Sequence, residues 1–405
     1  MPKRLLFICQ YFSPEVFRGN DIAFDVVKRG GEVTVICGTP NYPKGRFFDG
    51  YGWFKRRKET VNGVKVIRIP IIPRGEGSKL KLLVNYFSYF IAASLYLPFH
   101  LMANKRYDAC FVQQLSPVMM SVPGILFKKL TKRPLYTWVL DLWPESLKAA
   151  GGVNNKKILG FFERFAKSEY KNSDVILVSS KGFAKNITAK GDYAGKIQFM
   201  PNWAEDELLS EERPQIPALP EGFSVLFAGN VGEAQDFDSI VEAAKLLKAE
   251  DDIRFVIVGD GRKKEWVEEQ IKENGLEGRI LMLGRYDISY MPSFFAAADC
   301  LLLPLKDDEI MNLTVPAKMQ AYMANGKPIL AMINGDANEL ITEVGCGISI
   351  PASCPEALVE AIKALKSKSK EELNAMGERG RRFCEENYSK TKILDNLYNL
   401  IFIQQ

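Results

Sequence analysis

Short apolar runs alternate with longer helical stretches along the first half of the chain. Six runs have the length and the β-branched content of buried strands, at residues 5–9, 33–36, 64–69, 109–112, 135–140 and 175–178. This alternation is typical of a parallel sheet covered by helices, because parallel strands need crossover connections. The pattern predicts an α/β domain over residues 1–204.

The same alternation restarts after residue 222. Its apolar runs lie at 225–228, 254–258, 280–283, 300–303, 329–331 and 347–350, with helical stretches such as 237–247 and 263–274 between them. Residues 205–222 are rich in Glu and Pro, which predicts a linker. The chain is therefore predicted to be α/β, with two tandem Rossmann-like domains at 1–204 and 223–388. A last helix at 389–405 would pack back on the first domain, and the active site would lie in the interdomain cleft.

Composition narrows the classes of protein. A chain of 405 residues fits two domains. Its seven cysteines are scattered without a C-x-x-C pair, which favours reduced thiols in the cytoplasm. His100 is the only histidine, so a zinc site and a Ser-His-Asp hydrolase are not expected. Asp236-Phe237-Asp238 has the spelling of a metal-binding D-x-D motif, but helix capping explains it at a predicted helix start. We predict no metal.

Charge and hydropathy leave the membrane question open. The formal net charge is +5, and basic clusters such as 55–58 lie in the first half of the chain. No aromatic-rich basic motif accompanies them, so nucleic acid is not an expected partner. Residues 82–103 contain no charged side chain and are long enough to span a bilayer. Because this segment also contains Asn85, Pro98 and His100, an interfacial helix or an outer helix of a soluble enzyme remains an alternative.

Two segments of the first domain could carry chemistry. Arg18, Gly19 and Asn20 follow the first strand and precede a helix, an arrangement whose free amides favour anions. An ordinary turn capped by Asn20 or Asp21 explains them equally well. Asp141 and Glu145 follow the strand at 135–140, where carboxylates can bind sugar hydroxyls or take a proton. The alternative is a helix start with Asp141 as the cap and Pro144 in the first turn.

The second domain offers candidates for phosphate binding. Gly229, Asn230 and Gln235 follow its first strand and combine close backbone approach with amide side chains, although a plain turn is the alternative reading. Gly259 belongs to Gly259-Asp260-Gly261, which is only a fragment of the dinucleotide fingerprint and weakens the case for a nicotinamide dehydrogenase.

The segment 314–328 predicts a capped helix that binds an anion. Thr314 is predicted as the N-cap, Pro316 as part of the first turn and Gly326 as the C-terminal stop. Lys318 lies in the predicted first turn, where a cation opposes the helix dipole. Its position therefore predicts an anionic ligand held by Lys318 and by free amides.

Taken with these segments, the chain resembles family 4 of the retaining glycosyltransferases, of GT-B fold. The residues that carry the resemblance are Val258-Gly259-Asp260-Gly261 and the Lys318 helix that ends in Ala324-Asn325-Gly326-Lys327-Pro328. More narrowly, the chain is similar to the WbuB-type branch of O-antigen and capsule sugar transferases, which is associated with N-acetyl-L-fucosamine transfer. That similarity rests on Asn41-Tyr42-Pro43-Lys44-Gly45, Ile72-Pro73-Arg74, residues 138–146, Pro201-Asn202-Trp203-Ala204 and residues 229–235.

The resemblance implies roles for several residues. The Gly19 loop would approach the donor phosphates, Asp141 would contact the sugar, and Arg285 with Tyr286 would lie beside the base. The diphosphate would be bound by Thr314, Val315 and Lys318. The chain also departs from the family. Leu313 and Ala321 stand where two glutamates eight residues apart are usual, Asn230 and Gln235 replace Arg and Lys, and Leu140 replaces His.

The resemblance thus implies a metal-independent enzyme that uses a UDP-sugar as substrate and needs no cofactor. It would transfer the sugar to a polyprenyl-diphosphate-linked acceptor in polysaccharide assembly. It would be cytoplasmic and peripheral on the inner face of the bacterial plasma membrane, in contact with anionic lipid. Because the two glutamates are missing, the alternative is a noncatalytic nucleotide-sugar-binding or assembly subunit.

Overall fold

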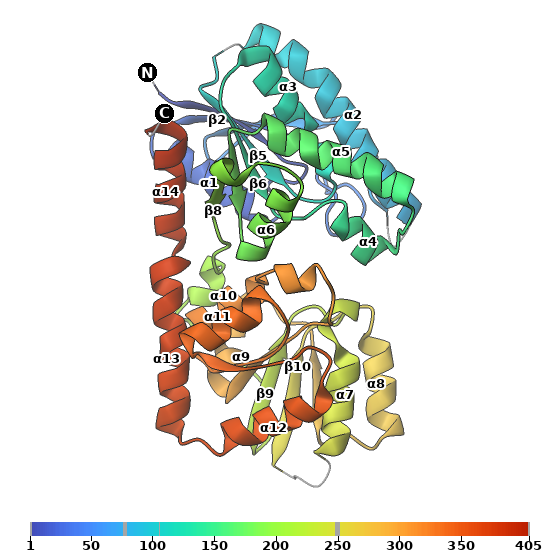
Figure 1. Cartoon of the computed structure of the whole chain (residues 1–405), viewed down its shortest axis with the longest axis vertical. Helices are drawn as coiled ribbons and strands as arrows, with labels where there is room; N and C mark the ends of the chain where they lie inside the picture. Colours follow the sequence, from blue (N-terminus) through green and yellow to red (C-terminus); the bar gives the residue numbers. More distant parts are fainter. Residues whose placement is uncertain (1, 76–78, 105, 248–251, 404–405) are drawn as a thin grey trace. The chain divides into compact units, whose positions relative to one another are not determined.

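The computed structural model describes residues 2–75, 79–104, 106–247 and 252–403. The chain divides into two compact units (Figure 1). Unit 1 comprises Met1–Met200 and Thr391–Gln405, and unit 2 comprises Pro201–Lys390. Residue 1 of the predicted first domain and residues 404–405 of the predicted last helix lie outside the described residues.

Unit 1 is built on an eight-stranded sheet. Its strands are β1 (Arg4–Ile8), β2 (Glu32–Gly38), β3 (Lys58–Val61), β4 (Val64–Ile69), β5 (Ala109–Gln114), β6 (Leu135–Val139), β7 (Val175–Val178) and β8 (Ile197–Phe199). Their order is β3-β4-β2-β1-β5-β6-β7-β8. Every neighbouring pair is parallel except β3 and β4, which form an antiparallel hairpin.

Helices cover both faces of this sheet. They are α1 (Arg18–Lys28), α2 (Lys79–Ala103), α3 (Val122–Thr131), α4 (Glu145–Gly151), α5 (Lys156–Asn172), α6 (Lys181–Ala189) and α14 (Lys390–Phe402), with the short η1 (Val118–Ser121) and η2 (Ala194–Lys196). The α2 side chains Tyr89, Ala93 and Leu97 join the same core as Ile36. On α14, the Leu400 carbonyl accepts a hydrogen bond from Tyr136 of β6. The last helix therefore completes unit 1.

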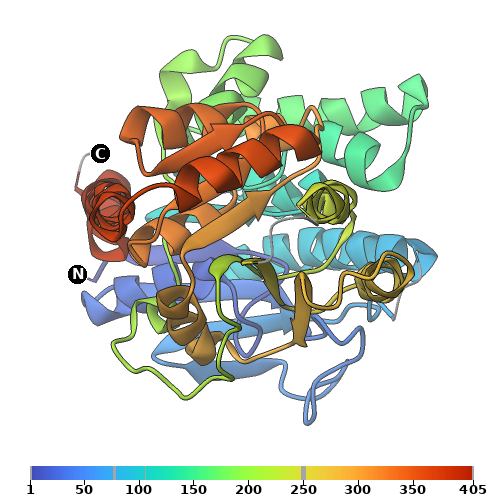
Figure 2. The same cartoon turned by 90° about the horizontal axis from the view of Figure 1, so that it is seen from below.

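Unit 2 contains a six-stranded, wholly parallel sheet with helices on both faces (Figures 1 and 2). Its strands are β9 (Phe223–Ala228), β10 (Ile253–Val258), β11 (Ile280–Gly284), β12 (Cys300–Pro304), β13 (Ile329–Met332) and β14 (Gly347–Ile350), in the order β11-β10-β9-β12-β13-β14. The helices are α7 (Phe237–Leu246), α8 (Lys264–Glu273), α9 (Met291–Ala297), α10 (Ala317–Ala324), α11 (Asp336–Val344), α12 (Pro355–Lys366) and α13 (Lys370–Asn387). Short 3-10 turns are η3 (Asp206–Leu209), η4 (Glu233–Gln235), η5 (Ile288–Tyr290) and η6 (Met311–Leu313).

Both faces of the unit 2 sheet are buried. Val225 and Phe227 of β9 pack in one core with α7 and α12, whereas Leu226 and Ala228 pack in the other with α10. Since alternate residues of a strand point to opposite faces, a strand buried on both sides has a continuous apolar sequence. This is the pattern that predicted the sheet, and the predicted pair of Rossmann-like α/β domains is confirmed.

The segment predicted as a linker, 205–222, lies against unit 2. Leu208 of η3 is buried in the unit 2 core, and Ser293 donates a hydrogen bond of 2.7 Å to the Pro214 carbonyl. By contacts, the boundary between the units falls between Met200 and Pro201.

Candidate functional site

The carboxyl ends of the unit 2 strands gather most of the predicted site residues. Strand order reverses between β9 and β12, so the loops that follow these two strands diverge at that point. Gly229 directly follows β9, and α10 with Lys318 comes after β12. Ligands of open parallel sheets bind at such switch points.

Lys318 places its ammonium group in an apolar setting. The Nζ atom lies 3.9 Å from the Phe227 ring centroid and, among the described residues, has no hydrogen-bond partner. Burial lowers the pKa of Lys318 to about 7. A buried cation of this kind is stabilised by an anion, which would raise that pKa again.

Gly229 and Gly259 let two loops approach each other and Lys318. Gly229 has a φ of +137°, and a Cβ atom on it would lie 2.6 Å from Lys318 Nζ. A Cβ atom on Gly259, after β10, would overlap the Gly229 carbonyl. In the Gly229 loop, Asn230 is exposed, and the buried Oε1 of Gln235 has no partner within the described part of the chain. Backbone and amide groups thus lie beside the cation, as phosphate binding requires.

Two predictions about the start of α10 are wrong. The helix begins at Ala317 with Pro316 at the N-cap, so Pro316 is not in the first turn. Thr314 is not the cap, because its hydroxyl donates a 2.8 Å hydrogen bond to the Ile310 carbonyl. Lys318 does lie in the first turn, beside amides that lack partners within the helix. Gly326, with a φ of +64°, follows the last turn as predicted, and Val315 is buried.

Arg285 and Tyr286 follow β11, the strand next to β10. Arg285 is exposed, and the Tyr286 ring packs against Phe294 with centroids 4.8 Å apart. The Gly259 amide donates a 2.8 Å hydrogen bond to the Gly284 carbonyl, which holds the ends of β10 and β11 together. Arg285 and Tyr286 are therefore presented at the same sheet edge as Gly259.

The D-x-D segment is engaged in local contacts. Asp238 pairs with Lys263, and this hydrogen bond and charge outweigh the opposing effect of burial and lower the pKa of Asp238. Asp236 occupies the N-cap position of α7, but its side chain accepts from the Ser239 hydroxyl at 2.8 Å, so the predicted capping bond is not formed. Among the described residues, no group of three or more His, Cys, Asp or Glu side chains could hold a metal ion.

In unit 1, the switch point lies between β1 and β5. The alternative in which Asn20 or Asp21 caps α1 is wrong, because the helix begins at Arg18 with Phe17 as its N-cap. Asn20 instead holds the preceding loop, since its Nδ2 donates to the Glu15 carbonyl at 2.7 Å. Gly19 is buried where a Cβ atom would overlap Gln113 of β5. Arg18 is half-buried at the same helix start.

Asp141 and Glu145 have different partners. Asp141 follows β6 and hydrogen-bonds Ser116 in the loop after β5, while burial raises its pKa. It does not cap α4, which begins at Glu145 with Pro144 as its N-cap, so the alternative of a helix start capped by Asp141 is wrong. Glu145 pairs with Lys190 at 2.7 Å and accepts from Asn186 at 3.2 Å. Glu145 is thus tied to the α6 region, whereas Asp141 faces the loop after β5.

A set of polar residues in unit 1 was not singled out from the sequence. Glu15 accepts the backbone amides of Asn41 and Tyr42 at 2.8 and 2.7 Å, and burial raises its pKa to about 7. Its second oxygen, together with Gln10 Oε1 and the Tyr11 hydroxyl, is buried without a partner in the described part of the chain. The available signal was their position, since Gln10 and Tyr11 directly follow the apolar run at 5–9.

Arg74 brings a cation to the same region. Its guanidinium lies 4.9 Å from the Tyr42 ring centroid, and its amide donates to Asn41 Oδ1 at 3.1 Å. The charges of Arg74 and Asp141 both act on Tyr86, whose pKa is raised by burial. Buried unsatisfied polar groups beside aromatic rings and a cation are the features of a site for a polar, anionic molecule.

Solved structures share this fold. Sucrose-phosphate synthase from Thermosynechococcus elongatus superposes with a TM-score of 0.75 at 15% identity, covering 100% of both chains. Anabaena Alr3699/HepE in complex with UDP and glucose gives a TM-score of 0.66 at 15% identity, covering 99% of each chain. The two units thus have the GT-B fold of glycosyltransferases.

Sequence comparison relates the chain to known glycosyltransferases. Residues 210–383 match the family described as "Glycosyl transferases group 1". The chain is 26% identical over 374 residues to "Putative colanic acid biosynthesis glycosyl transferase WcaI" of Escherichia coli strain K12, covering 87% of this chain and 89% of that protein. It is 30% identical over 270 residues to "Probable glycosyltransferase WbjE" of Pseudomonas aeruginosa, covering 63% and 65%. These matches support placing the chain among the group 1 glycosyltransferases.

Proposed function

We propose that this protein is a family 4 glycosyltransferase of the WbuB type that transfers a sugar from a UDP-sugar with retention of configuration. The acceptor is a polyprenyl-diphosphate-linked sugar in O-antigen or capsule assembly, and N-acetyl-L-fucosamine is the candidate sugar. A relative named for colanic acid biosynthesis and a fold neighbour in complex with UDP and glucose support this proposal.

The buried Lys318 ammonium carries the proposal for the donor. With the amides at the start of α10, it would bind the donor diphosphate and stabilise the charge that develops on the leaving group without a metal. Gly229, Asn230, Gln235, Thr314 and Val315 would surround the phosphates. The base would lie near Gly259, Arg285 and Tyr286. Ribose is left without an assigned carboxylate, because the usual glutamates are Leu313 and Ala321.

We assign the sugar and acceptor side to unit 1. Asp141 would contact the transferred sugar, and the Arg18–Asn20 loop would approach the phosphates, while Glu145 has the weaker claim because Lys190 already pairs with it. The donor phosphate itself would accept the acceptor's proton. The Glu15 region, with its unsatisfied oxygens and Arg74, fits an acceptor that carries hydroxyl and phosphate groups.

A membrane contact through α2 is part of the proposal. Among the described residues, the segment Leu80–Ala103 is the one helix long and apolar enough to cross a membrane, judged by length and composition alone. One face packs on the sheet, whereas an apolar stripe is exposed: Leu80, Leu83, Val84, Ile91, Leu95, Phe99 and Met102. We call these residues the α2 stripe. The stripe supports peripheral attachment to the cytoplasmic face of the plasma membrane.

The donor assignment is tested by thermal unfolding with UDP. UDP should raise the unfolding temperature of the wild type by mass action, and Lys318→Met should remove most of that shift. Lys272→Met, which removes an exposed lysine from α8, is the matched control and should keep it. An unchanged UDP shift in Lys318→Met would refute the role of Lys318.

Turnover separates the enzyme from the alternative of a noncatalytic nucleotide-sugar-binding or assembly subunit, which the loss of the two glutamates suggests. Transfer from a UDP-sugar to a lipid-linked acceptor should proceed and should survive EDTA. UDP-sugar binding without transfer would favour the noncatalytic subunit, and loss of transfer in EDTA would contradict the metal-independent mechanism.

A further inference from the structure

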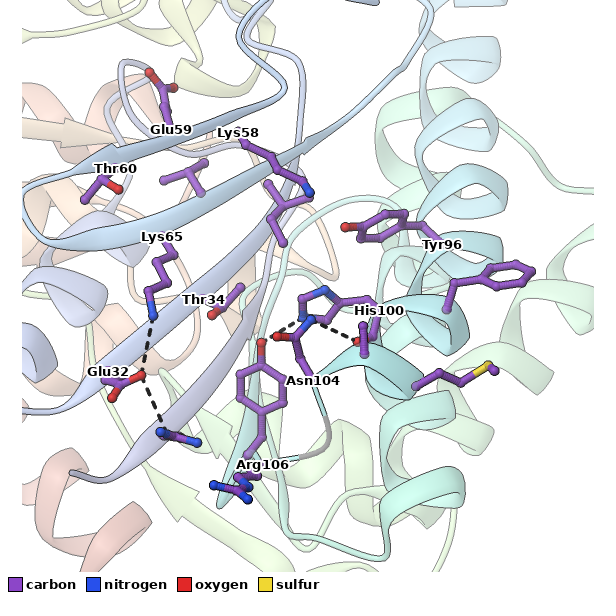
Figure 3. A pocket seen from close by; sticks show the side chains of 17 residues that line it. Glu32, Thr34, Lys58, Glu59, Thr60, Lys65, Tyr96, His100, Asn104 and Arg106 are labelled. Carbon is purple, nitrogen blue, oxygen red and sulfur yellow. Dashed lines mark hydrogen bonds and ion pairs between the residues drawn. The ribbon is translucent and has the colours of Figure 1, made fainter. Parts of the chain in front are cut away.

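A groove of about 1190 Å³ lies at the opposite end of the unit 1 sheet from the site described above (Figure 3). It is lined by the amino-terminal ends of β1, β2 and β4, by β3, and by the last turns of α2. Gln10 and Gln113 lie at the carboxyl ends of β1 and β5. Since a strand rises about 3.3 Å per residue, the length of the strands separates the groove from those residues.

The charges that line the groove favour an anion. Arg4, Lys58, Lys65 and Arg106 face two carboxylates, Glu32 and Glu59. Glu32 Oε2 lies 3.6 Å from Arg4 Nε and 3.5 Å from Lys65 Nζ. Glu59 forms an ion pair with the buried Arg68, which lies outside the groove. Lys58 and Arg106 make no ion pair with any described residue. These two cations are therefore available to a ligand.

The floor of the groove is neutral and polar. His100 Nε2 lies 2.7 Å from the Tyr107 hydroxyl, and both side chains are buried. Burial and the charge of Lys58 lower the pKa of His100, so the ring is neutral at physiological pH. Figure 3 shows Lys58 extending from β3 toward Tyr96 and His100 of α2. A bound anion would thus meet a cation above a floor of neutral hydrogen-bonding groups.

The groove is continuous with the α2 stripe. Phe99 and Met102 line the groove and also belong to the stripe, and their side chains are 71% and 72% exposed. An anionic site that passes directly into an exposed apolar strip matches a molecule with a charged head and an apolar tail. Neither a soluble phosphate nor a uniform layer of surface charge would use both features.

We propose that this groove binds the phosphate headgroup of one anionic phospholipid while its acyl chains lie along the α2 stripe. Lys58 and Arg106 contact the phosphate. Tyr96 and Asn104 also line the groove and can form hydrogen bonds with it. The proposal rests on the membrane contact in the proposed function and adds a defined headgroup site. Such a site fixes the orientation of unit 1 on the bilayer.

The test is flotation of the purified full-length protein with vesicles of phosphatidylcholine, alone or mixed with phosphatidylglycerol. The variant Lys58→Gln/Arg106→Gln should lose about 25-fold in partitioning to the mixed vesicles, because each cation near an anionic surface contributes about 1 kcal/mol. The matched control Lys28→Gln/Lys185→Gln removes two exposed lysines from α1 and α6, and it should change partitioning less than about twofold. Equal losses in both variants, or none in either, would overturn the headgroup site.

Further measurements identify the source of the phosphate and distinguish a failure of the headgroup site from a failure of the proposed function. Leu95→Lys should weaken binding to both kinds of vesicle, whereas the groove variant should weaken only the binding that depends on phosphatidylglycerol. If glycerol 3-phosphate stabilises the wild type as well as a short-chain phosphatidylglycerol does, the ligand is a soluble phosphate and the lipid proposal is wrong. The UDP-induced thermal shift should be the same in wild type and groove variant, so a failure of the donor assignment is recognised separately.

Discussion

Lys318 makes the stability of unit 2 depend on pH in a direction that can be predicted. Its pKa is about 7 in the folded state, well below that of a lysine in an unfolded chain. Between about pH 7 and pH 10 the unfolded chain therefore binds more protons, so stability rises with pH. Below about pH 7, Lys318 is protonated in both the folded and the unfolded state, and the free energy of unfolding is lowered by the full cost of burying the charge.

Replacing Lys318 by methionine should remove this pH dependence. Lys318→Met should be more stable than the wild type by roughly 2–4 kcal/mol at pH 7, and the difference should shrink toward pH 10. Calorimetric unfolding of both proteins at several pH values measures it, with Lys272→Met as the control. A wild type whose stability runs parallel to that of Lys318→Met would contradict the burial of this cation. If Lys318 binds the donor as proposed, the stability lost at this residue is the cost of holding a cation ready for the diphosphate.

Glu169 gives the complementary case in unit 1. It is fully buried on α5 beside Ser121, and burial raises its pKa well above the usual range. Below about pH 4, Glu169 is protonated in both the folded and the unfolded state, and its ionisation costs the folded state nothing. As pH rises toward the folded pKa, only the unfolded state loses the proton, so the free energy of unfolding decreases. Glu169→Gln should therefore exceed the wild type in stability, by up to about 1.4 kcal/mol more for each pH unit gained.

Thermal unfolding between pH 5.5 and pH 8.5 measures this trend. Glu163→Gln, on the surface of the same helix, should change stability by less than about 0.5 kcal/mol at every pH. The interpretation fails if the two variants respond alike.

At the scale of elements, the hairpin of β3 and β4 depends on its turn. Asn62 and Gly63 connect the strands with φ values of +48° and +81°, as a two-residue hairpin turn requires. A Cβ atom on Gly63 would also lie 2.7 Å from Val27. Gly63→Ala should cost about 1–2 kcal/mol, whereas Gly52→Ala, with open space around it, should cost less than about 0.5 kcal/mol. Chemical denaturation compares them, and equal costs would contradict the turn.

The strands that the sequence could predict are those with an apolar run, which include the partly buried edge strands β11 and β14 as well as strands buried on both faces. All twelve predicted strands are present, because strands such as β9 and β10 are continuous apolar runs between turns. The two strands that were missed, β3 and β8, are short, largely exposed and lie at the sheet edges. β3 is mostly polar and β8 has only three residues, so neither shows the apolar run that marks the other strands, and pairing with a neighbour makes them strands.

Helix starts were less predictable for a different reason. A capping residue competes with tertiary partners for its side chain, and sequence does not show those partners. Thr314 bonds the Ile310 carbonyl, and Asp141 bonds Ser116, so neither caps the helix that follows it. Lys318 could be singled out because a cation in a first turn opposes the local dipole. Glu15 and Gln10 could not, because their importance comes from burial beside loops that are distant in sequence.

At the scale of the whole molecule, α14 follows unit 2 in the sequence but packs in unit 1. Ile393, Leu394, Leu397, Ile401 and Phe402 are buried, and Arg29, the residue that follows α1, pairs with Asp395 at 2.5 Å. Leu397→Ala/Ile401→Ala should destabilise unit 1 by about 5 kcal/mol through lost apolar contacts. Hydrogen exchange should therefore accelerate in β1 and β6, while β9 of unit 2 stays protected.

Substitution of exposed residues on the same helix provides the control. Asn396→Ala/Asn399→Ala should leave exchange in both units unchanged. Acceleration in β9 to the same extent as in β1 would show that the two units unfold together and would contradict their division.

The discontinuity of unit 1 also sets an order of events during synthesis. Residues 201–390 form one uninterrupted unit and can fold as soon as they leave the ribosome. The sheet of unit 1 emerges earlier, yet the face that α14 covers stays open until residue 402 has been made. During that interval unit 1 is incompletely folded, although most of its residues are synthesised before those of unit 2. We therefore expect a chaperone to bind unit 1 of the nascent chain.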